Sequence, residues 1–107
     1  GRREVGFPPY CARVLVRAES TNADAPRQFL QQVSGRFSQE GGAVRIWGPV
    51  PAPMERRAGR YRAQLLIQAE DRRRLQPVLS LVVPALDRIP GARQVRWSVD
   101  VDPVEML

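Results

Sequence analysis

Hydrophobic periodicity constrains this chain more than any other feature, because it divides the sequence into six segments of two kinds. Four segments place apolar residues at every second position, which is typical of strands with one buried face. The clearest of them runs from 12 to 19, where Val14 and Val16 point one way and arginines point the other. The other two segments repeat apolar residues every three or four positions, as amphipathic helices do. The order along the chain is β-α-β-β-α-β.

Local signals set the boundaries of these segments. Further strands are expected at 44–48, 61–68 and 95–102. The helices are expected to bury Phe29, Leu30, Val33 and Phe37 in the first, and Leu75, Val78, Leu79, Val82 and Leu86 in the second. Asp24 and Asp71 are the expected helix caps. Pro77 and Pro84 interrupt the second helix, and because proline has no amide hydrogen they predict a kink or a tightened turn there.

This element order predicts an α+β fold in which two helices cover one face of a four-stranded antiparallel sheet, the ferredoxin-like arrangement. A chain of 107 residues is long enough for one such domain and too short for two. Each strand offers its apolar face to the helices. The opposite face is expected to collect polar side chains, namely Arg13, Arg17, Arg62, Gln64 and Arg96.

The charge of the chain indicates an anionic partner. Seventeen basic residues, all of them arginine, oppose eleven acidic residues and give a net charge of +6. Codon bias in a GC-rich genome explains the absence of lysine, but it does not explain the net charge. A positive domain attracts nucleic acid, acidic peptides or anionic membrane surfaces. Every apolar run, such as residues 81–86, is far shorter than the roughly 20 residues that a membrane span needs.

Residue types exclude most enzyme chemistry. The chain has no histidine, and Cys11 is its only cysteine, so neither a zinc site nor a Ser/His or Cys/His relay can be assembled. Asp100 and Asp102 share one strand face, but they lack a third ligand or a general acid. We therefore expect no catalytic residue and no metal ligand. The single cysteine and the polar start of the chain favour the cytoplasm.

Positive charge is concentrated between residues 55 and 74, which hold seven arginines and three acids. Residues 48–62 are expected to form a long, proline-rich connection between two strands, and long loops in compact domains are often functional. The arginines of this connection are candidate contacts for DNA phosphates: Arg56, Arg57, Arg60 and Arg62. A solvated surface loop, or a rigid spacer packed on a neighbouring domain, explains the same pattern without DNA.

The start of the second helix carries three consecutive arginines, 72–74, which oppose the helix dipole unless an anion binds there. Arg72 and Gln76 are four residues apart and so share one helix face. A guanidinium and an amide in this arrangement can hold a peptide carboxylate while an apolar groove takes a side chain. The spacing is also common on ordinary surface helices.

The two tryptophans differ in the role that the pattern predicts for them. Trp97 lies on the apolar face of its strand and is expected in the core, whereas Trp47 lies on the polar face, where it is a candidate for stacking on a base. An RNA-recognition sheet would carry aromatic residues on the polar face of its first and last strands. This sequence has none there, so that class is disfavoured.

Several stretches of the chain resemble a known family. The first reads Gly-Pro-Val-Pro-Ala-Pro at 48–53, followed by Arg57, Gly59, Tyr61, Arg62 and the run 64–68, and the second reads Val-Arg-Trp-Ser-Val-Asp-Val-Asp-Pro at 95–103. Both are similar to signatures of the C-terminal domains of PriA (primosomal protein N′), a bacterial replication-restart helicase. Arg2, Arg3 and Phe7-Pro8-Pro9-Tyr10 resemble the link from the second helicase lobe. The resemblance implies a linker at 1–10 and a C-terminal DNA- and partner-binding domain at 11–107.

The resemblance also implies a fold, partners and site residues. The fold would be like that of a small-subunit ribosomal protein. The domain would bind forked or single-stranded DNA at stalled forks, the acidic C-terminal tail of single-stranded DNA-binding protein, and other primosome proteins. The Arg and Gln of the tail pocket map onto Arg72 and Gln76, although Pro77 directly after Gln76 departs from the pattern.

The catalytic parts of such a parent lie elsewhere. It would be an ATP-dependent 3′-to-5′ DNA helicase that holds ATP, magnesium and zinc outside this fragment, for which we expect no cofactor and no catalytic activity. An alternative role is a scaffold that packs on the helicase lobes of its own chain without touching DNA.

Overall fold

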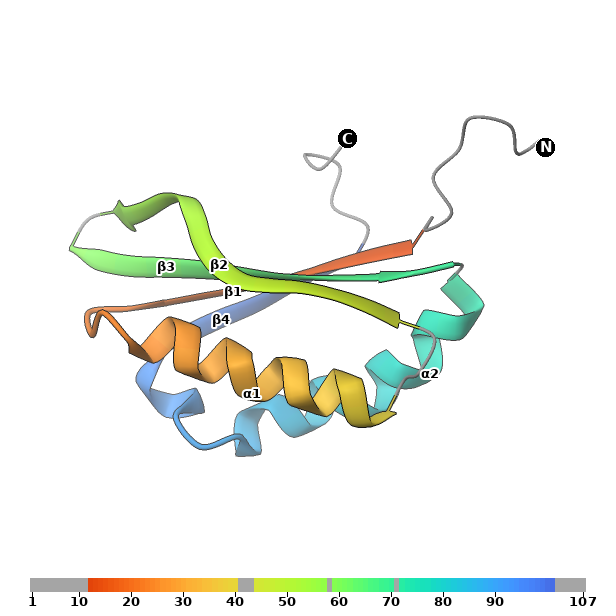
Figure 1. Ribbon diagram of the computed structural model, residues 1–107. Helices are drawn as coiled ribbons and strands as arrows, with labels where there is room; N and C mark the ends of the chain where they lie inside the picture. Colours follow the sequence, from red (N-terminus) through yellow and green to blue (C-terminus); the bar gives the residue numbers. More distant parts are fainter. Residues whose placement is uncertain (1–11, 41–43, 58, 71, 102–107) are drawn as a thin grey trace.

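A computed structural model describes residues 12–40, 44–57, 59–70 and 72–101, with side chains except at 40 and 53–57 (Figure 1). Its elements are β1 (Ala12–Ser20), α1 (Ala25–Glu40), β2 (Val44–Arg57), β3 (Arg60–Ala69), α2 (Arg72–Val82), the short 3₁₀ helices η1 (Val83–Arg88) and η2 (Ala92–Gln94), and β4 (Arg96–Val101). The predicted β-α-β-β-α-β order and the α+β class are confirmed. The expected linker at 1–10 lies outside the described residues.

The four strands form one sheet in the order β2-β3-β1-β4, and every neighbouring pair is antiparallel. The strands β1 and β3 lie in the centre, and β2 and β4 form the edges. Both helices lie against the same face of the sheet (Figure 1). The result is two layers, in which the described helices cover one face of the sheet, and the other face is called the open face below.

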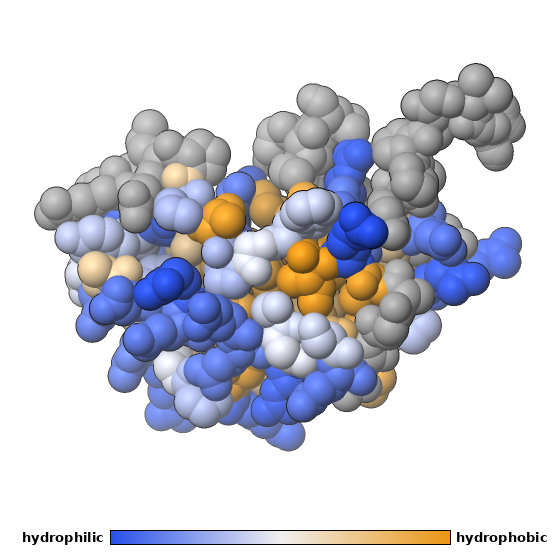
Figure 2. Space-filling model, viewed as in Figure 1, coloured by the Kyte–Doolittle hydropathy of each residue, from blue (hydrophilic) through white to orange (hydrophobic). Residues whose placement is uncertain are grey.

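The core lies between the covered face and the helices. Alternate residues of the central strands point into it, including Val14 and Val16 from β1 and Leu65 and Ile67 from β3, and all four are fully buried. The helices contribute the residues that their periodicity predicted: Phe29, Leu30, Val33, Phe37, Leu75, Val78, Leu79, Val82 and Leu86. In the view of Figure 2, hydrophobic surface is seen mainly along the β2 edge, above the hydrophilic outer face of α1.

The expected long connection at 48–62 is wrong. The strand β2 continues to Arg57 and pairs with β3 as far as Arg57 opposite Arg60, so most of this stretch is one arm of a hairpin. The prolines misled the prediction because proline usually ends strands. At the edge of a sheet a missing amide hydrogen is tolerated, since one side of the strand has no partner to satisfy. The pairing shifts register between Trp47 and Val50 and again between Pro51 and Arg56.

Gly48 makes the first of these register shifts possible. Its φ is +103°, in the region that residues with a Cβ rarely adopt. A Cβ added there would lie 3.0 Å from the Val50 nitrogen and 3.1 Å from the Gln64 carbonyl oxygen, both of which are backbone atoms. The bulge in β2 therefore requires glycine.

The residue that caps the start of α1 differs from the predicted one. Asp24 directly precedes α1, but the side chain that bonds the free amides is that of Asn22, whose Oδ1 accepts from the Asp24 and Ala25 amides at 2.9 and 3.2 Å. Asp71 lies outside the described residues. The helix α2 continues through Pro77, and it tightens into η1 with Pro84 in its first turn. The predicted tightened turn is therefore found at Pro84.

Phe29→Ala should destabilise the fold by about 3–5 kcal/mol, because Phe29 is buried and its ring lies 6.4 Å from that of Trp97. Urea denaturation followed by tryptophan fluorescence measures the change. The exposed neighbour Gln28, replaced by Ala, should change the unfolding free energy by no more than about 0.5 kcal/mol. Equal effects of the two changes would contradict the assignment of this helix face to the core.

Gly48→Ala should destabilise the fold by about 1–3 kcal/mol, because the substitution forces a strained φ and a close backbone contact. Gly35→Ala is the matched control, since Gly35 lies within α1 with nothing within 4 Å of its added Cβ. That change should instead stabilise the fold by about 0.5–1 kcal/mol. Thermal unfolding of both variants gives the comparison, and a neutral Gly48→Ala would refute the bulge.

Candidate nucleic-acid interface

The open face of the sheet is a strongly charged surface of the described part of the chain. Register and alternation place on it Arg13, Arg17, Glu19, Arg45, Arg60, Arg62, Arg96 and Asp100. These six arginines and two carboxylates give a net charge of +4. These eight charged side chains face away from the helices and toward solvent.

Strand register arranges this open face in rows that cross the sheet. One row joins Arg62 of β3, Glu19 of β1 and Arg96 of β4. Two rows further along, Trp47 of β2 lies opposite Leu66 of β3. The face therefore changes from charged to apolar over a short distance, and it offers both cations and a flat aromatic side chain.

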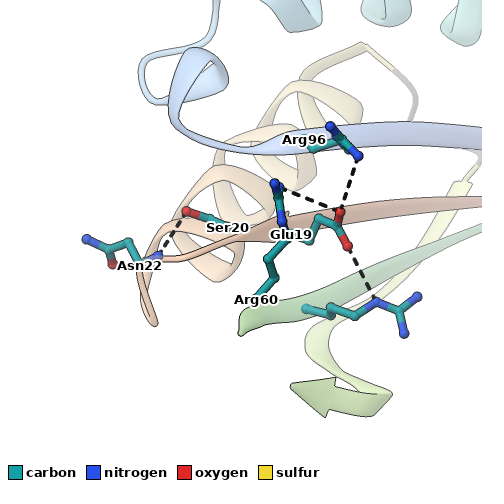
Figure 3. A network of polar contacts seen from close by, with 6 residues as sticks. Glu19, Ser20, Asn22, Arg60 and Arg96 are labelled. Atoms are coloured by element: carbon teal, nitrogen blue, oxygen red, sulfur yellow. Dashed lines mark hydrogen bonds and ion pairs between the residues drawn. The ribbon is translucent and has the colours of Figure 1, made fainter. Parts of the chain in front are cut away.

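Glu19 organises the arginines at one end of the face (Figure 3). Its two carboxylate oxygens lie 3.9 Å from Arg60 Nη1, 3.8 Å from Arg62 Nε and 4.0 Å from Arg96 Nη1. These separations are longer than hydrogen bonds, and each such exposed pair contributes only about 0–1 kcal/mol. One carboxylate therefore gathers three guanidinium groups without neutralising them.

A second ion pair lies at the β1–β4 side of the face. The Arg17 Nη1 donates to the Asp100 carboxylate, so one arginine of the open face is held by an acid on the neighbouring strand. Asp102, which shares a strand face with Asp100 in the sequence pattern, lies outside the described residues. The contact with Arg17 gives Asp100 a role in holding an arginine in place.

The structure describes the side chains of two of the four arginines predicted to contact DNA. Arg60 and Arg62 lie together beside Glu19 on the open face. Arg56 and Arg57 lie at the end of β2 and pair with Tyr61 and Arg60, but their side chains lie outside the described part of the chain.

Sequence reasoning placed Arg17 and Arg96 on the polar face of the sheet and did not count them as site residues. The alternation at 44–47 likewise places Arg45 on the side of Trp47, although Arg45 was not counted as a site residue, and the organising role of Glu19 was missed. That role depends on three strands meeting, for which the sequence carries no local signal.

Trp47 lies on the open face and Trp97 faces the core, as predicted. The Trp97 ring stacks on that of Phe29 with an angle of 24° between the planes. Trp47 is 51% exposed, its indole N–H donates to Gln68 Oε1, and the Arg45 guanidinium lies 5.8 Å from the ring centroid.

Arg72 and Gln76 lie on consecutive turns of α2, and both are exposed. Gln76 lines a groove of about 410 Å³ between the helical layer and the edge strand β4. The remaining lining residues are Leu79, Ser80, Val83, Pro84, Val99 and Val101. Arg72 lies one helical turn before Gln76, outside this lining. Because α2 continues through Pro77, Gln76 keeps its helical position beside the groove.

The described residues contain no cluster of three or more histidine, cysteine, aspartate or glutamate side chains that would suit a metal ion. None of the described helices has the length and apolar character needed to cross a membrane.

The fold and its charged face define the class of this protein: it is a two-layer α+β domain whose open sheet face is rich in arginine. The chain belongs to the family of the primosomal protein N C-terminal domain, which matches residues 3–104. It is 34% identical over 106 residues to the replication restart protein PriA of Haemophilus influenzae, and 32% identical over 108 residues to that of Synechocystis sp.. The PriA of Bacillus subtilis is 26% identical over 107 residues. Each match covers 98–99% of this chain.

The chain spans only 12–14% of the length of these relatives and corresponds to their non-catalytic C-terminal domain. Among solved structures, the designed protein Foldit4 has a TM-score of 0.61 at 11% identity, covering 86% of this chain and 96% of its own. A hydantoinase/carbamoylase family amidase from Burkholderia ambifaria has a TM-score of 0.54 at 14% identity, covering 86% of this chain and 27% of its own. These two likenesses show the fold alone.

Proposed function

We propose that this domain serves replication restart by binding DNA through the open face of its sheet. The observation that carries the proposal is the net charge of +4 on that face, gathered from all four strands. Phosphate contacts of this kind supply affinity without reading sequence. The names of the relatives, replication restart proteins, support the same biological setting.

The loose arrangement around Glu19 suits this task. Three guanidinium groups within about 4 Å of one carboxylate are held near one another before DNA arrives. Because each pair is weak, a phosphate can replace the carboxylate at little cost. Guanidinium also forms two parallel hydrogen bonds to phosphate oxygens, which favours the exchange.

The groove at Gln76 supports a second part of the proposal, the binding of an acidic protein tail. Leu79, Val83 and Val99 offer an apolar surface for a terminal side chain, and Gln76 offers an amide beside them. Arg72 is positioned one turn away for a carboxylate. We propose the acidic C-terminal tail of single-stranded DNA-binding protein as the occupant, because it combines negative charge with a terminal phenylalanine.

Arg62→Ala should weaken DNA binding uniformly across sequences and reduce the slope of log K against log salt by about one, because one phosphate contact is lost. Glu19→Gln should strengthen binding, since it removes the acid that competes with phosphate. Fluorescence anisotropy with a labelled forked oligonucleotide at several salt concentrations measures both.

Arg36→Ala is the charge-matched control for that measurement, because Arg36 is exposed on α1 in the layer behind the sheet. It should change the salt slope far less than Arg62→Ala. A flat salt response in the unmodified chain would exclude DNA and favour the scaffold role. Equal responses of Arg36→Ala and Arg62→Ala would exclude the open face as the binding surface.

Arg72→Ala should weaken the binding of a synthetic acidic tail peptide by about tenfold or more, as expected when a charge-assisted hydrogen bond is lost. Arg73→Ala removes the same charge from a neighbouring exposed position on a different side of α2, and it should have a smaller effect. Isothermal titration calorimetry compares the two. Equal losses would mean that only general electrostatics attracts the peptide, and unchanged affinity in Arg72→Ala would remove this site.

A further inference from the structure

Trp47 is an exposed aromatic side chain that the phosphate contacts do not explain. It is 51% exposed although it is the residue type with the largest apolar surface, and it lies on the open face opposite Leu66 and beside Arg45. Trp97, in contrast, is half-buried against Phe29 on the covered face. An exposed indole ring offers a flat apolar surface that a binding partner can cover favourably.

Two neighbours fix the orientation of the Trp47 ring. Its N–H donates to Gln68 Oε1 on the adjacent strand, and the Arg45 guanidinium lies 5.8 Å from the ring centroid on the same strand. A ring held in this way loses little conformational entropy when a ligand stacks on it. Arg45 also brings a positive charge to the place where a phosphate would accompany a stacked base.

The position of Trp47 relative to the arginines matches a short length of nucleic acid. Its partner Leu66 lies four residues from Arg62 along β3, a separation of about 13 Å in an extended strand. That distance corresponds to about four nucleotides at the rise of a stacked strand, and to fewer in an extended one. A single chain of DNA can therefore contact the arginines at one end of the face and Trp47 at the other.

We propose that Trp47 is a stacking platform for an unpaired base of single-stranded DNA whose phosphates lie on the open face. This inference rests on the proposed DNA-binding function and adds to it a preference for unpaired DNA. Aromatic rings stack on any base, because every base has a π-face, but a base inside a duplex is already stacked on both sides. Trp47 thus separates single-stranded from double-stranded ligands without reading sequence.

The test uses the 107-residue chain, a dT oligonucleotide of about twelve nucleotides, and a blunt duplex of the same length. Trp47→Leu keeps apolar bulk but removes the π-face, and it should weaken binding to the single strand by between about 5-fold and 150-fold. Binding to the duplex should change less than twofold. Trp47→Phe keeps an aromatic face and should retain most of the affinity.

Intrinsic tryptophan fluorescence gives a second readout of stacking, which can be measured in a variant that still binds DNA. The chain has two tryptophans, and stacking on a base quenches only the one that it touches. Adding the single strand should quench the unmodified chain, and the quenching should disappear in Trp47→Phe while binding persists. Leu81→Ala is the control for exposed apolar surface, because Leu81 is 60% exposed on α2 and should leave affinity unchanged.

The outcomes separate this inference from the function on which it rests. If the unmodified chain binds no oligonucleotide, the proposed DNA binding fails as well. If it binds with a steep salt dependence but Trp47→Leu binds the single strand equally well, stacking is refuted and Trp47 belongs to a contact with another protein surface. If Trp47→Leu weakens single strand and duplex alike, its role is structural, and the inference is again refuted.

Discussion

Everything in this domain depends on the register of the antiparallel pairs, because register decides which side chains share a face. With Val14 opposite Ile67 and Val99 opposite Val16, one alternate set of strand residues points toward the helices, and the intervening set, which carries the arginines, points away. A slip of one residue in any pair would bury arginines and expose valines. The burial of Phe29, Phe37 and Leu75 against the covered face holds the register in place. The same constraint that forms the core therefore also assembles the positive face.

A face that carries this much positive charge would repel itself without acids at suitable places. Glu19 lies among three guanidinium groups, and Asp100 pairs with Arg17, so repulsion is reduced where the arginines are closest. Glu19 is partly exposed and its pairs are longer than hydrogen bonds, which keeps them weak and exchangeable. Stability and binding depend on different faces of the sheet. Apolar packing on the covered face stabilises the fold, and the arginines around Glu19 on the open face support the proposed binding of DNA.

Most of the fold was predictable from the sequence because periodicity is a local property. The alternation in β1 and the helical spacing of α1 were sufficient to identify the covered face, and Trp47 and Trp97 were assigned to the correct faces. The path of β2 was not predictable in the same way, since Pro49 and Pro51 signal a loop unless the strand is known to lie at an edge, which only the tertiary pairing shows. Likewise, Glu19 is unremarkable in sequence, and its three arginine neighbours come from β3 and β4 at a distance along the chain. The cap at Asn22 was missed because Asp24 offers the same chemistry one position before α1.

The central claim is that DNA lies on the open face of the sheet, and chemical-shift mapping by NMR tests it most directly. Titration of a short single-stranded oligonucleotide into the ¹⁵N-labelled chain should shift the side-chain Nε–Hε signals of Arg62 and Arg96 and the indole N–H signal of Trp47. The Nε–Hε signal of Arg36 on α1 should remain in place. Shifts confined to α1 and α2, with the arginines of β3 and β4 unaffected, would contradict the claim.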